Sequence, residues 1–501
     1  MNNKIIKHNL VSKIKLFTLL VFTTASFLIF YSKAFAFTEP PYIPVNKHTA
    51  VDGNNMVTSC SGTQYYVDDD CASGGTGTAN QANGVCSGAT RAFATLAAAQ
   101  SAMVAGDCVK IHAGTYIYNS GFQWSKSGTP SHETIIEAYG DGDAIMEMHG
   151  TTNGSQFSVS GTYIIFDGGS NRQLIFNGEN ETAGTVALNP SNTTTHITLS
   201  RILAKNNGGI WYVYPNDLRC NWSNVGISGT GDYLKVYNSE VSGCCGAGIY
   251  SGSGDHQEYR NNLIHDNKGT GLQINTHGGF SSTDITIAGN AIYNNGLGGV
   301  TGQNRPGIAI LSAQNILYDV YVYNNLLWGN QSAGIGVGGD SNIRARIYNN
   351  TILNNPIWGL TITGNNVDIQ NNIMRNNGTG IWSSADFDIA TYNVTLNTVT
   401  LKNNIIGIYG QTHLDYSSLK PGNINTDPQF LSTDPNNSNY LKLSPSGPAI
   451  NVGATISLVT TDFFGTSRPQ GTAYDIGAYE YPSGGSGDIT PPSAPTGVTV
   501  S

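Results

Sequence analysis

The chain has 501 residues, with 33 acidic and 24 basic side chains, 61 glycines and only 11% charged residues. Average globular chains carry about 25% charged residues and about 7% glycine. In this chain Gly, Asn, Ser and Thr therefore occupy many positions where charged residues are usual. This composition excludes a coiled coil, a helical bundle and a nucleic-acid-binding protein. Outside the first 36 residues there is no apolar run of the ~20 residues that a membrane-spanning helix needs.

Residues 1–36 have the layout of a cleaved secretory signal. Five lysines and no acid accompany the apolar stretch 16–30, and Ala34 and Ala36 form an Ala-x-Ala exit. The alternative is a retained single-span anchor. Cleavage leaves 19 basic and 33 acidic residues, a formal charge of −14. We therefore expect an acidic secreted protein (extracellular, on the cell surface or in the periplasm) with no membrane insertion after cleavage.

All seven cysteines follow the signal, and export makes disulfides the expected state. Cys60, Cys71, Cys86 and Cys108 would form two bridges, and Cys220 would pair with Cys244 or Cys245. The connectivity within the first four stays open. No spacing of Cys and His suggests zinc.

The only convincing amphipathic helix of the sequence covers residues 92–104. We expect it to cover the open N-terminal end of a solenoid core, because solenoids need capped ends. It follows an N-terminal extension at 37–63, and residues 108–118 are the expected first coil.

One pattern recurs from residue 200 to 406: an alternating strand, an Asn pair, a short apolar strand, a Gly-containing turn and a third short strand. The clearest copies are 257–274, 320–337, 345–362 and 367–382. The second position of each pair advances by 23, 28, 35, 25, 22 and 32 residues, along Ser239, Asn262, Asn290, Asn325, Asn350, Asn372 and Asn404. The shortest repeat has about 22 residues, and the longer repeats have additional residues in their loops. This pattern indicates a solenoid of stacked coils.

Three short strands of period two in each coil predict an all-β parallel β-helix. The first strands would bury Val236, Tyr259, Ile287, Val322, Ile347 and Ile369, and the third strands Ile249, Leu272, Val300, Ile335, Leu360 and Ile381. The Asn pairs fit a tight turn between the first and second strands, because Asn tolerates the left-handed conformation and stacked amides hydrogen-bond along the axis. A β-sandwich with polar loops does not explain the fixed Asn register.

Residues 65–70 and 92–116 and the Asn-pair coils resemble secreted right-handed parallel β-helix proteins of the pectate-lyase-like superfamily. Residues 427–430, 440–453, 462–469 and 474–481 resemble the closing segment frequent in bacterial members. The resemblance covers residues 64–481 and implies a right-handed β-helix at 64–425 closed by 426–481. Residues 482–501 form a Gly/Ser/Pro linker that resembles the approach to a fibronectin type III module.

The resemblance places the substrate on the face formed by the third strands. The outward positions there are polar or aromatic, which suits sugar hydroxyls and ring faces. We predict substrate binding by Tyr250, Gln273, Asn275, Gln303 and Trp382. A second outward column holds His265, Tyr293, Trp328, Leu353 and Arg375, and we interpret it as isolated exposed aromatics, with a sugar-stacking strip as the alternative.

Ionisable residues gather over the coils from residue 250 to 305. β-Elimination of a uronate needs a base for the C5 proton and a cation for the resulting anion. The candidate catalytic residues are Lys268, Arg305, His277 and His265. Asp255, Asp266 and Asp284 would hold calcium, the expected cofactor, through hard oxygen ligands. In the alternative reading these aspartates satisfy the backbone of turns.

The sequence therefore predicts a monomeric, secreted polysaccharide-binding β-helix, with a polysaccharide lyase as the favoured activity. The main alternative is a non-catalytic surface or adhesin-type protein. A glycoside hydrolase, which needs two carboxylates about 5 to 9 Å apart, is disfavoured because the superfamily's Asn-Thr-Asp motif occurs only at 425–427, in the closing segment.

Overall fold

The computed structural model describes residues 60–79, 86–149, 157–178, 189–190, 195–207, 224–276, 281–296, 305–312, 317–339, 343–364, 366–378, 387–391, 398–407 and 422–482. Contacts divide the chain into two units. The first comprises residues 1–43 and 434–438 and is described only at 434–438, where Asn436 donates two hydrogen bonds to Asp434. The second comprises 44–433 and 439–501 and holds every strand below.

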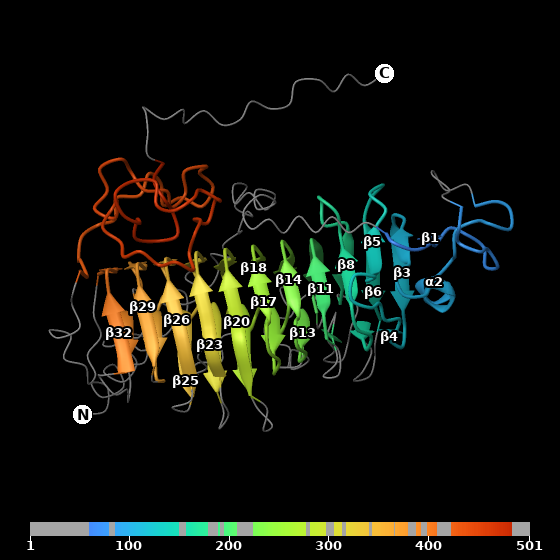
Figure 1. Ribbon diagram of the computed structural model, residues 1–501, viewed down its shortest axis with the longest axis horizontal. Helices are drawn as coiled ribbons and strands as arrows, with labels where there is room; N and C mark the ends of the chain where they lie inside the picture. The colour runs from blue at the N-terminus through green and yellow to red at the C-terminus, as the bar shows by residue number, and fades with distance from the viewer. Residues whose placement is uncertain are drawn as a thin grey trace, which may run out of the picture. The chain divides into compact units, whose positions relative to one another are not determined.

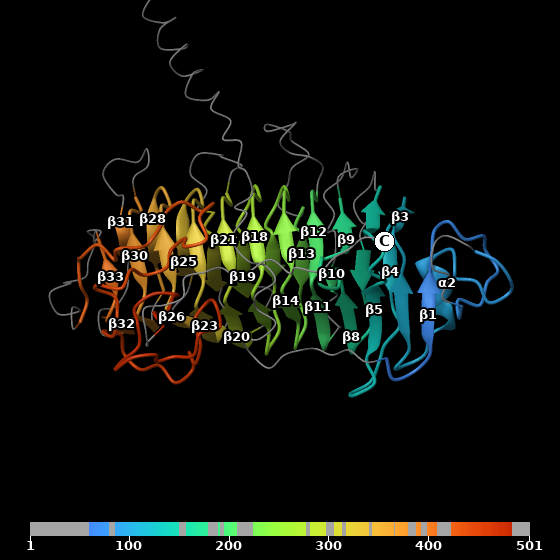
Figure 2. The same ribbon diagram turned by 90° about the horizontal axis from the view of Figure 1, so that it is seen from above.

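Within the described residues the strands form sheets of 12, 11, seven and three strands, and neighbouring strands pair in parallel. Figures 1 and 2 show the strands of the 12-stranded sheet side by side in chain order. Successive strands of the chain alternate between sheets, so successive coils add successive rungs to the first and second sheets and, from β13 to β31, to the third. This topology is that of the expected parallel β-helix.

The first sheet contains β1 (Gln64–Val67), β2 (Cys108–Ile111), β5 (Thr134–Ala138), β8 (Ile164–Asp167), β11 (Ile197–Ser200), β14 (Lys235–Tyr237), β17 (Glu258–Arg260), β20 (Ser282–Ala288), β23 (Leu317–Tyr323), β26 (Ile343–Tyr348), β29 (Val367–Gln370) and β32 (Val399–Lys402). The second contains β3 (Gly114–Tyr118), β6 (Ala144–Met148), β9 (Leu174–Asn177), β12 (Ile202–Lys205), β15 (Glu240–Ser242), β18 (Leu263–His265), β21 (Ala291–Tyr293), β24 (Leu326–Trp328), β27 (Thr351–Leu353), β30 (Ile373–Arg375) and β33 (Ile405–Ile406).

The third sheet contains β13 (Ile227–Gly229), β16 (Ile249–Ser251), β19 (Leu272–Thr276), β22 (Ile308–Ser312), β25 (Ala333–Gly339), β28 (Trp358–Ile362) and β31 (Phe387–Thr391). A small sheet joins β10 (Asn189–Pro190), β7 (Phe157–Val159) and β4 (Phe122–Trp124). The three long sheets enclose one hydrophobic core.

The predicted core column of the first strands is confirmed. Val236, Tyr259, Ile287, Val322, Ile347 and Ile369 pair in register from one coil to the next and are fully buried. The column of the third strands differs at two coils. Ile308 stands where Val300 was expected, and Ile389 where Ile381 was expected. Both coils carry longer connections before the strand, and the alternating segments 308–312 and 387–391 supply the apolar residues that match the neighbouring rungs.

The Asn ladder between the first and second sheets is confirmed. The side-chain Oδ1 of each ladder Asn accepts from the backbone N–H and the Nδ2 of the Asn one coil earlier, at 2.8–3.0 Å, along Asn262, Asn290, Asn325, Asn350, Asn372 and Asn404. These residues are buried. The ladder therefore satisfies the backbone of each tight turn inside the core.

A second ladder, between the second and third sheets, was not predicted. It runs along Asn267, Asn295, Asn330, Asn355 and Asn377 and ends on the carboxylate of Asp388. The residue before each of these Asn residues is Asp, Asn or Gly in the left-handed conformation. The sequence signal was present in repeated pairs such as Asn354 and Asn355, which the Gly-containing turn obscured.

The first Asn of each pair has a different role from the second. Asn324, Asn349, Asn371 and Asn403 adopt φ values of 50° to 58°, which only Gly, Asn and Asp accept readily. Their Nδ2 atoms donate to backbone carbonyls of the closing segment, at Thr461, Asp475, Ala454 and Val452. The closing segment (red in Figure 1) therefore packs along the corner between the first and second sheets.

A buried ion pair organises the closing segment. The guanidinium of Arg468 donates to Glu480 at 2.7 Å, and both side chains are almost fully buried. Arg468 also donates to the carbonyls of Asp475 and Gly477. These hydrogen bonds offset part of the desolvation of the two charges, and burial still lowers the pKa of Arg468.

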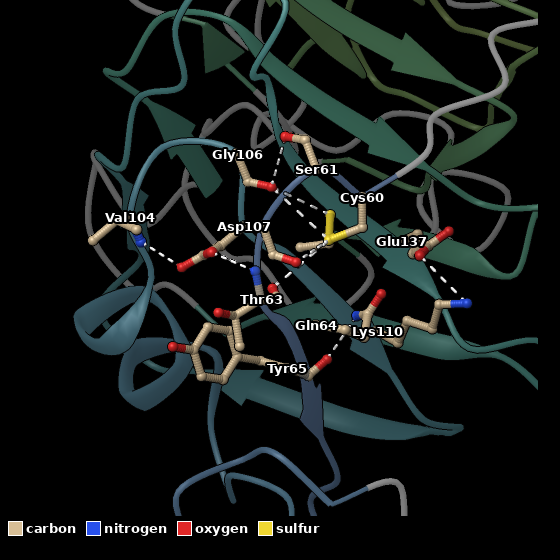
Figure 3. The surroundings of a disulfide bond; sticks show 12 residues. Cys60, Ser61, Thr63, Gln64, Tyr65, Val104, Gly106, Asp107, Lys110 and Glu137 are labelled. Carbon is tan, nitrogen blue, oxygen red and sulfur yellow. Dashed lines mark hydrogen bonds and ion pairs between the residues drawn. A yellow bond between two sulfur atoms is a disulfide. The ribbon is translucent and has the colours of Figure 1, made fainter.

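The N-terminal end is held by a disulfide and a carboxylate. Cys60 pairs with Cys108, and Cys71 pairs with Cys86. Asp107 accepts from the backbone N–H groups of Thr63 and Val104, each at 2.7 Å, beside the Cys60–Cys108 bridge (Figure 3). The segment before β1 is thereby fixed to the loop before β2.

The expected helix is shorter than 92–104 and spans Leu96–Ala102 (α2), with Thr95 as its N-cap. Leu96 and Ala99 belong to the same hydrophobic core as Val109 of β2. Its role as a cover for the open end stays a prediction. Cys245 is disulfide-bonded and Cys244 is a buried thiol, as the proposed pairing of one of them with Cys220 requires.

Residues 1–36, Cys220 and the tail from 483 onwards lie outside the described residues. Among the described helices, none has the length and apolar character needed to cross a membrane. Cleavage of the signal and the module-like nature of the tail stay predictions.

Replacing Asn325 with Ala should destabilise the coil stack. The change removes the acceptor of the backbone N–H of Asn290 and leaves that buried donor without its partner. We expect a loss of about 2 to 4 kcal/mol in the free energy of unfolding, measured by denaturant titration. Thr400→Ala, at an exposed position of β32, is the control and should change stability by less than about 0.5 kcal/mol. Equal effects of the two substitutions would contradict a stabilising ladder.

Candidate functional site

The outer face of the third sheet carries a column of residues that pair directly across neighbouring strands. The column runs through Tyr250, Gln273, Ala309, Gly336, Thr361 and Ala390. A second column holds Asn275, Leu311 and Gly338. The predicted positions of Tyr250, Gln273 and Asn275 on this face are therefore confirmed, and their role in binding stays a prediction.

A groove of about 330 Å³ follows this face. Its walls are formed by hydroxyl and amide side chains, by apolar side chains and by two glycines, and its lining residues are Thr270, Gln273, Pro306, Ala309, Leu311, Gly336, Val337, Gly338, Thr361 and Thr363. The groove spans strands β19 to β28. Its size is that of a small-ligand site.

Glycine at 336 and 338 keeps the floor of the groove low. A Cβ on Gly338 would lie 2.9 Å from the hydroxyl of Thr363, and one on Gly336 would lie 3.3 Å from the ring of Pro306. Any side chain at either position would therefore narrow the groove. Thr363 and Leu311 line the groove together with these glycines.

Tyr250, on β16, lies one rung beyond the groove, and Asn275 lies on β19, two residues after the lining residue Gln273. Burial raises the pKa of the Tyr250 hydroxyl, and a hydrogen bond with Asn275 lowers it in part. This phenol is therefore neutral at physiological pH and presents a hydrogen-bonding group next to Gln273.

Lys268 and Arg305 are brought together, in the turn before β19 and at the residue before Pro306. Nη1 of Arg305 donates to the backbone carbonyl of Lys268 at 3.0 Å. Lys268 is only 8% exposed, and burial lowers the pKa of Arg305. These two predicted catalytic residues thus adjoin the groove at Thr270 and Pro306.

His265 lies on the other side of the same turn, on the outer face of the second sheet. Its ring is 3% exposed, and its Nδ1 is 2.8 Å from Asp266 and its Nε2 3.4 Å from Glu240. Glu240 also binds Arg172 at 3.3 Å. Sequence reasoning missed Glu240 and Arg172, because they lie 25 and 93 residues before His265 and meet it only through the coil register.

The second outward column has the predicted order, but it is buried. His265 stacks on Tyr293 at 4.8 Å, and Tyr293 stacks on Trp328 at 4.4 Å between ring centres. Tyr440 of the closing segment packs against Trp328. The rings are thus neither isolated exposed aromatics nor an open sugar-stacking strip, because stacking and the closing segment cover their faces.

The three predicted calcium ligands do not converge. Asp266 follows β18 in the turn to the third sheet, whereas Asp255 lies between β16 and β17 and Asp284 lies within β20 of the first sheet. Asp255 accepts from the backbone N–H of Thr283, and Asp284 binds His256 at 2.7 Å. In the described part of the chain, the one group of three possible ligands within 4.8 Å is Asp68, Cys71 and Cys86, where the cysteines are already a disulfide.

Three predicted site residues, His277, Gln303 and Trp382, lie outside the described residues. Gln303 and Trp382 were expected on third strands. Those strands are instead formed by 308–312 and 387–391. Pro306, Ala309 and Leu311, which line the groove, were missed for the same reason, although the alternation of 308–312 was visible in the sequence.

His265→Gln should reduce the pH dependence of stability. Burial alone would lower the pKa of His265, but hydrogen bonds to Asp266 and Glu240 outweigh it and raise the pKa from 6.5 to about 9. A raised folded-state pKa gives stability that is complete below pH 6.5 and is lost as the pH rises through 9. The wild-type protein should lose up to about 3 kcal/mol more than the variant across this window.

Denaturant titrations at several pH values measure this difference. His132→Gln, at an exposed histidine, is the matched control and should follow the wild type. Identical pH profiles for wild type and His265→Gln would refute the role assigned to the cluster.

Comparisons with known proteins agree with this architecture. A family model described as right handed beta helix region matches residues 223–399. The structure of pectate lyase Pel9A is similar with a TM-score of 0.58 and 18% sequence identity, over 87% of this chain and 99% of that one. No curated protein matches the chain.

Two further solved structures are similar at lower scores. The Azotobacter vinelandii mannuronan C-5 epimerase AlgE4 A-module has a TM-score of 0.35 and 16% identity, over 64% of this chain and 89% of that one. A rhamnogalacturonan lyase has a TM-score of 0.36 and 14% identity, over 77% and 97%. The family match over residues 223–399 and the likeness in fold to Pel9A, together with the three parallel sheets, identify this chain as a right-handed parallel β-helix.

Proposed function

We propose that this protein binds a polysaccharide along the groove on the outer face of the third sheet. The groove is the observation that carries the proposal. It offers hydroxyl and amide groups at Thr270, Gln273, Thr361 and Thr363 beside apolar surface at Pro306. Sugars present the same combination of hydroxyl groups and apolar ring faces, so both kinds of contact would be used.

The likeness in fold supports this proposal without defining the chemistry, because one fold carries many activities. Pel9A is named a pectate lyase, and it shares the coil architecture on which the groove is built. Export through residues 1–36 would place the groove outside the cytoplasm, where such polymers occur.

β-Elimination is the second candidate function. Lys268 and Arg305 lie close to the groove residues Thr270 and Pro306 in the sequence, and elimination would need such a base and cation near the sugar. His265 would not take part, since its ring is buried between Asp266, Glu240 and Tyr293 on the second sheet. Asp255, Asp266 and Asp284 do not fit one calcium ion, so neither candidate uses calcium bound by this set.

Ala309→Trp should abolish polysaccharide binding. Ala309 lies in the groove between Gln273 and Gly336, so an indole there would occupy the volume that the sugar would otherwise fill. We expect at least a tenfold loss of affinity, equivalent to ~1.4 kcal/mol, by calorimetry with an oligosaccharide panel. Assays of reducing ends and of the ultraviolet absorbance of unsaturated sugars on the same samples distinguish binding alone from elimination.

Thr400→Trp places the same side chain on an exposed position of the first sheet and is the control. It should bind as the wild type does. Binding that survives Ala309→Trp in a folded protein would place the ligand elsewhere. New unsaturated products that disappear in Lys268→Ala and Arg305→Ala would establish the second candidate.

A further inference from the structure

We infer that the groove takes an uncharged glycan, and that a uronate chain is not its ligand. This inference rests on the proposed binding function and narrows it to one class of sugar. It follows from the charges that the coils place around the groove and from those that they place elsewhere.

Among the described residues, the lining contains no ionisable side chain. Threonine, glutamine, proline, glycine and aliphatic residues form the whole of it. A carboxylate in such a groove would lose part of its hydration, and no charged partner would replace it. A hydroxyl group loses much less, because Thr and Gln side chains accept and donate in place of water.

The basic side chains of the coils after residue 306 lie on faces other than that of the third sheet. From residue 306 to 401 the sequence contains only Arg344, Arg346 and Arg375 as basic residues. Arg344 and Arg346 bind the carboxylate of Asp319 on the first-sheet side. Arg375 ends β30 in the second sheet and donates to Asn425. This half of the groove therefore has no basic residue on its own face.

The two cationic residues near the β19 end of the groove have structural roles. Lys268 is buried in the turn before β19, and its carbonyl accepts from the Arg305 guanidinium. Arg305 itself is only partly exposed. Neither side chain lines the groove, although their neighbours Thr270 and Pro306 do.

Acidic residues, in contrast, occur in the sequence beside this sheet. The segments that lead from its strands to the first sheet contain Asp232, Asp255 and Asp340, and no Lys or Arg. Cleavage of residues 1–36 would leave a chain with a formal charge of −14. A polymer with one negative charge on each sugar would be repelled on approach, whereas a neutral chain would not.

Matched pairs of oligosaccharides test the inference. Each pair has the same linkage and length and differs only in the group at C6, which is a carboxylate in one member and uncharged in the other: hexagalacturonate and its full methyl ester, hexamannuronate and mannohexaose, hexaglucuronate and cellohexaose. Affinity is measured by calorimetry on the full chain at low and moderate salt. We expect at least one neutral member to bind, its acidic partner to bind at least tenfold more weakly, and the neutral affinity to be independent of salt.

Thr363→Lys supplies the charge that the groove lacks. Thr363 is exposed on the groove wall, so the ammonium would lie beside the ligand. At low salt the variant should reduce the preference for the neutral member at least threefold, and added salt should restore the preference. Thr400→Lys, on the first sheet, controls for the change in net charge and should leave the preference as in the wild type.

The outcomes separate the two proposals. An acidic member that binds the wild type as tightly as its neutral partner, or more tightly, overturns the inference and leaves binding in the groove intact. Absence of binding to every member overturns the proposed function itself. If a neutral oligosaccharide still binds Ala309→Trp, the ligand lies outside the groove. That result overturns both the proposed function and this inference.

Discussion

The buried backbone of the tight turns is the constraint on which this structure depends. Each coil changes direction within one or two residues, and the N–H groups at these corners face a core without water. An unpaired N–H there would cost about 1 to 3 kcal/mol. Asn side chains remove this cost by accepting from the backbone of the preceding coil, at Asn325 and its equivalents in one ladder and at Asn330 and its equivalents in the other.

The same turns also hold the closing segment. At Asn324, Asn349, Asn371 and Asn403 the first Asn of the pair adopts the left-handed conformation and donates to a carbonyl of that segment. Adjacent amides therefore serve the inside and the outside of one corner. This explains why pairs recur where a single Asn would satisfy the core.

Charge is distributed unequally over the faces of the helix. The first and second sheets and the closing segment hold ion pairs, including Arg346 with Asp319, His265 with Asp266 and Arg468 with Glu480. The groove on the third sheet contains none. Most ionisable residues that draw attention in the sequence are consequently structural, and neutral hydrogen-bonding groups form the surface that is left for a ligand.

The sequence alone determined the coil, because the Asn register and the period-two strands repeat locally and each signal is complete within one repeat. It also placed Tyr250, Gln273 and Asn275 on the right face. Only the tertiary structure decided which side chains meet. Glu240 reaches His265 across one rung, and Ala309 replaces the expected strand residue after a long connection. Such contacts depend on register between coils, and loop length, which the local pattern does not encode, sets that register.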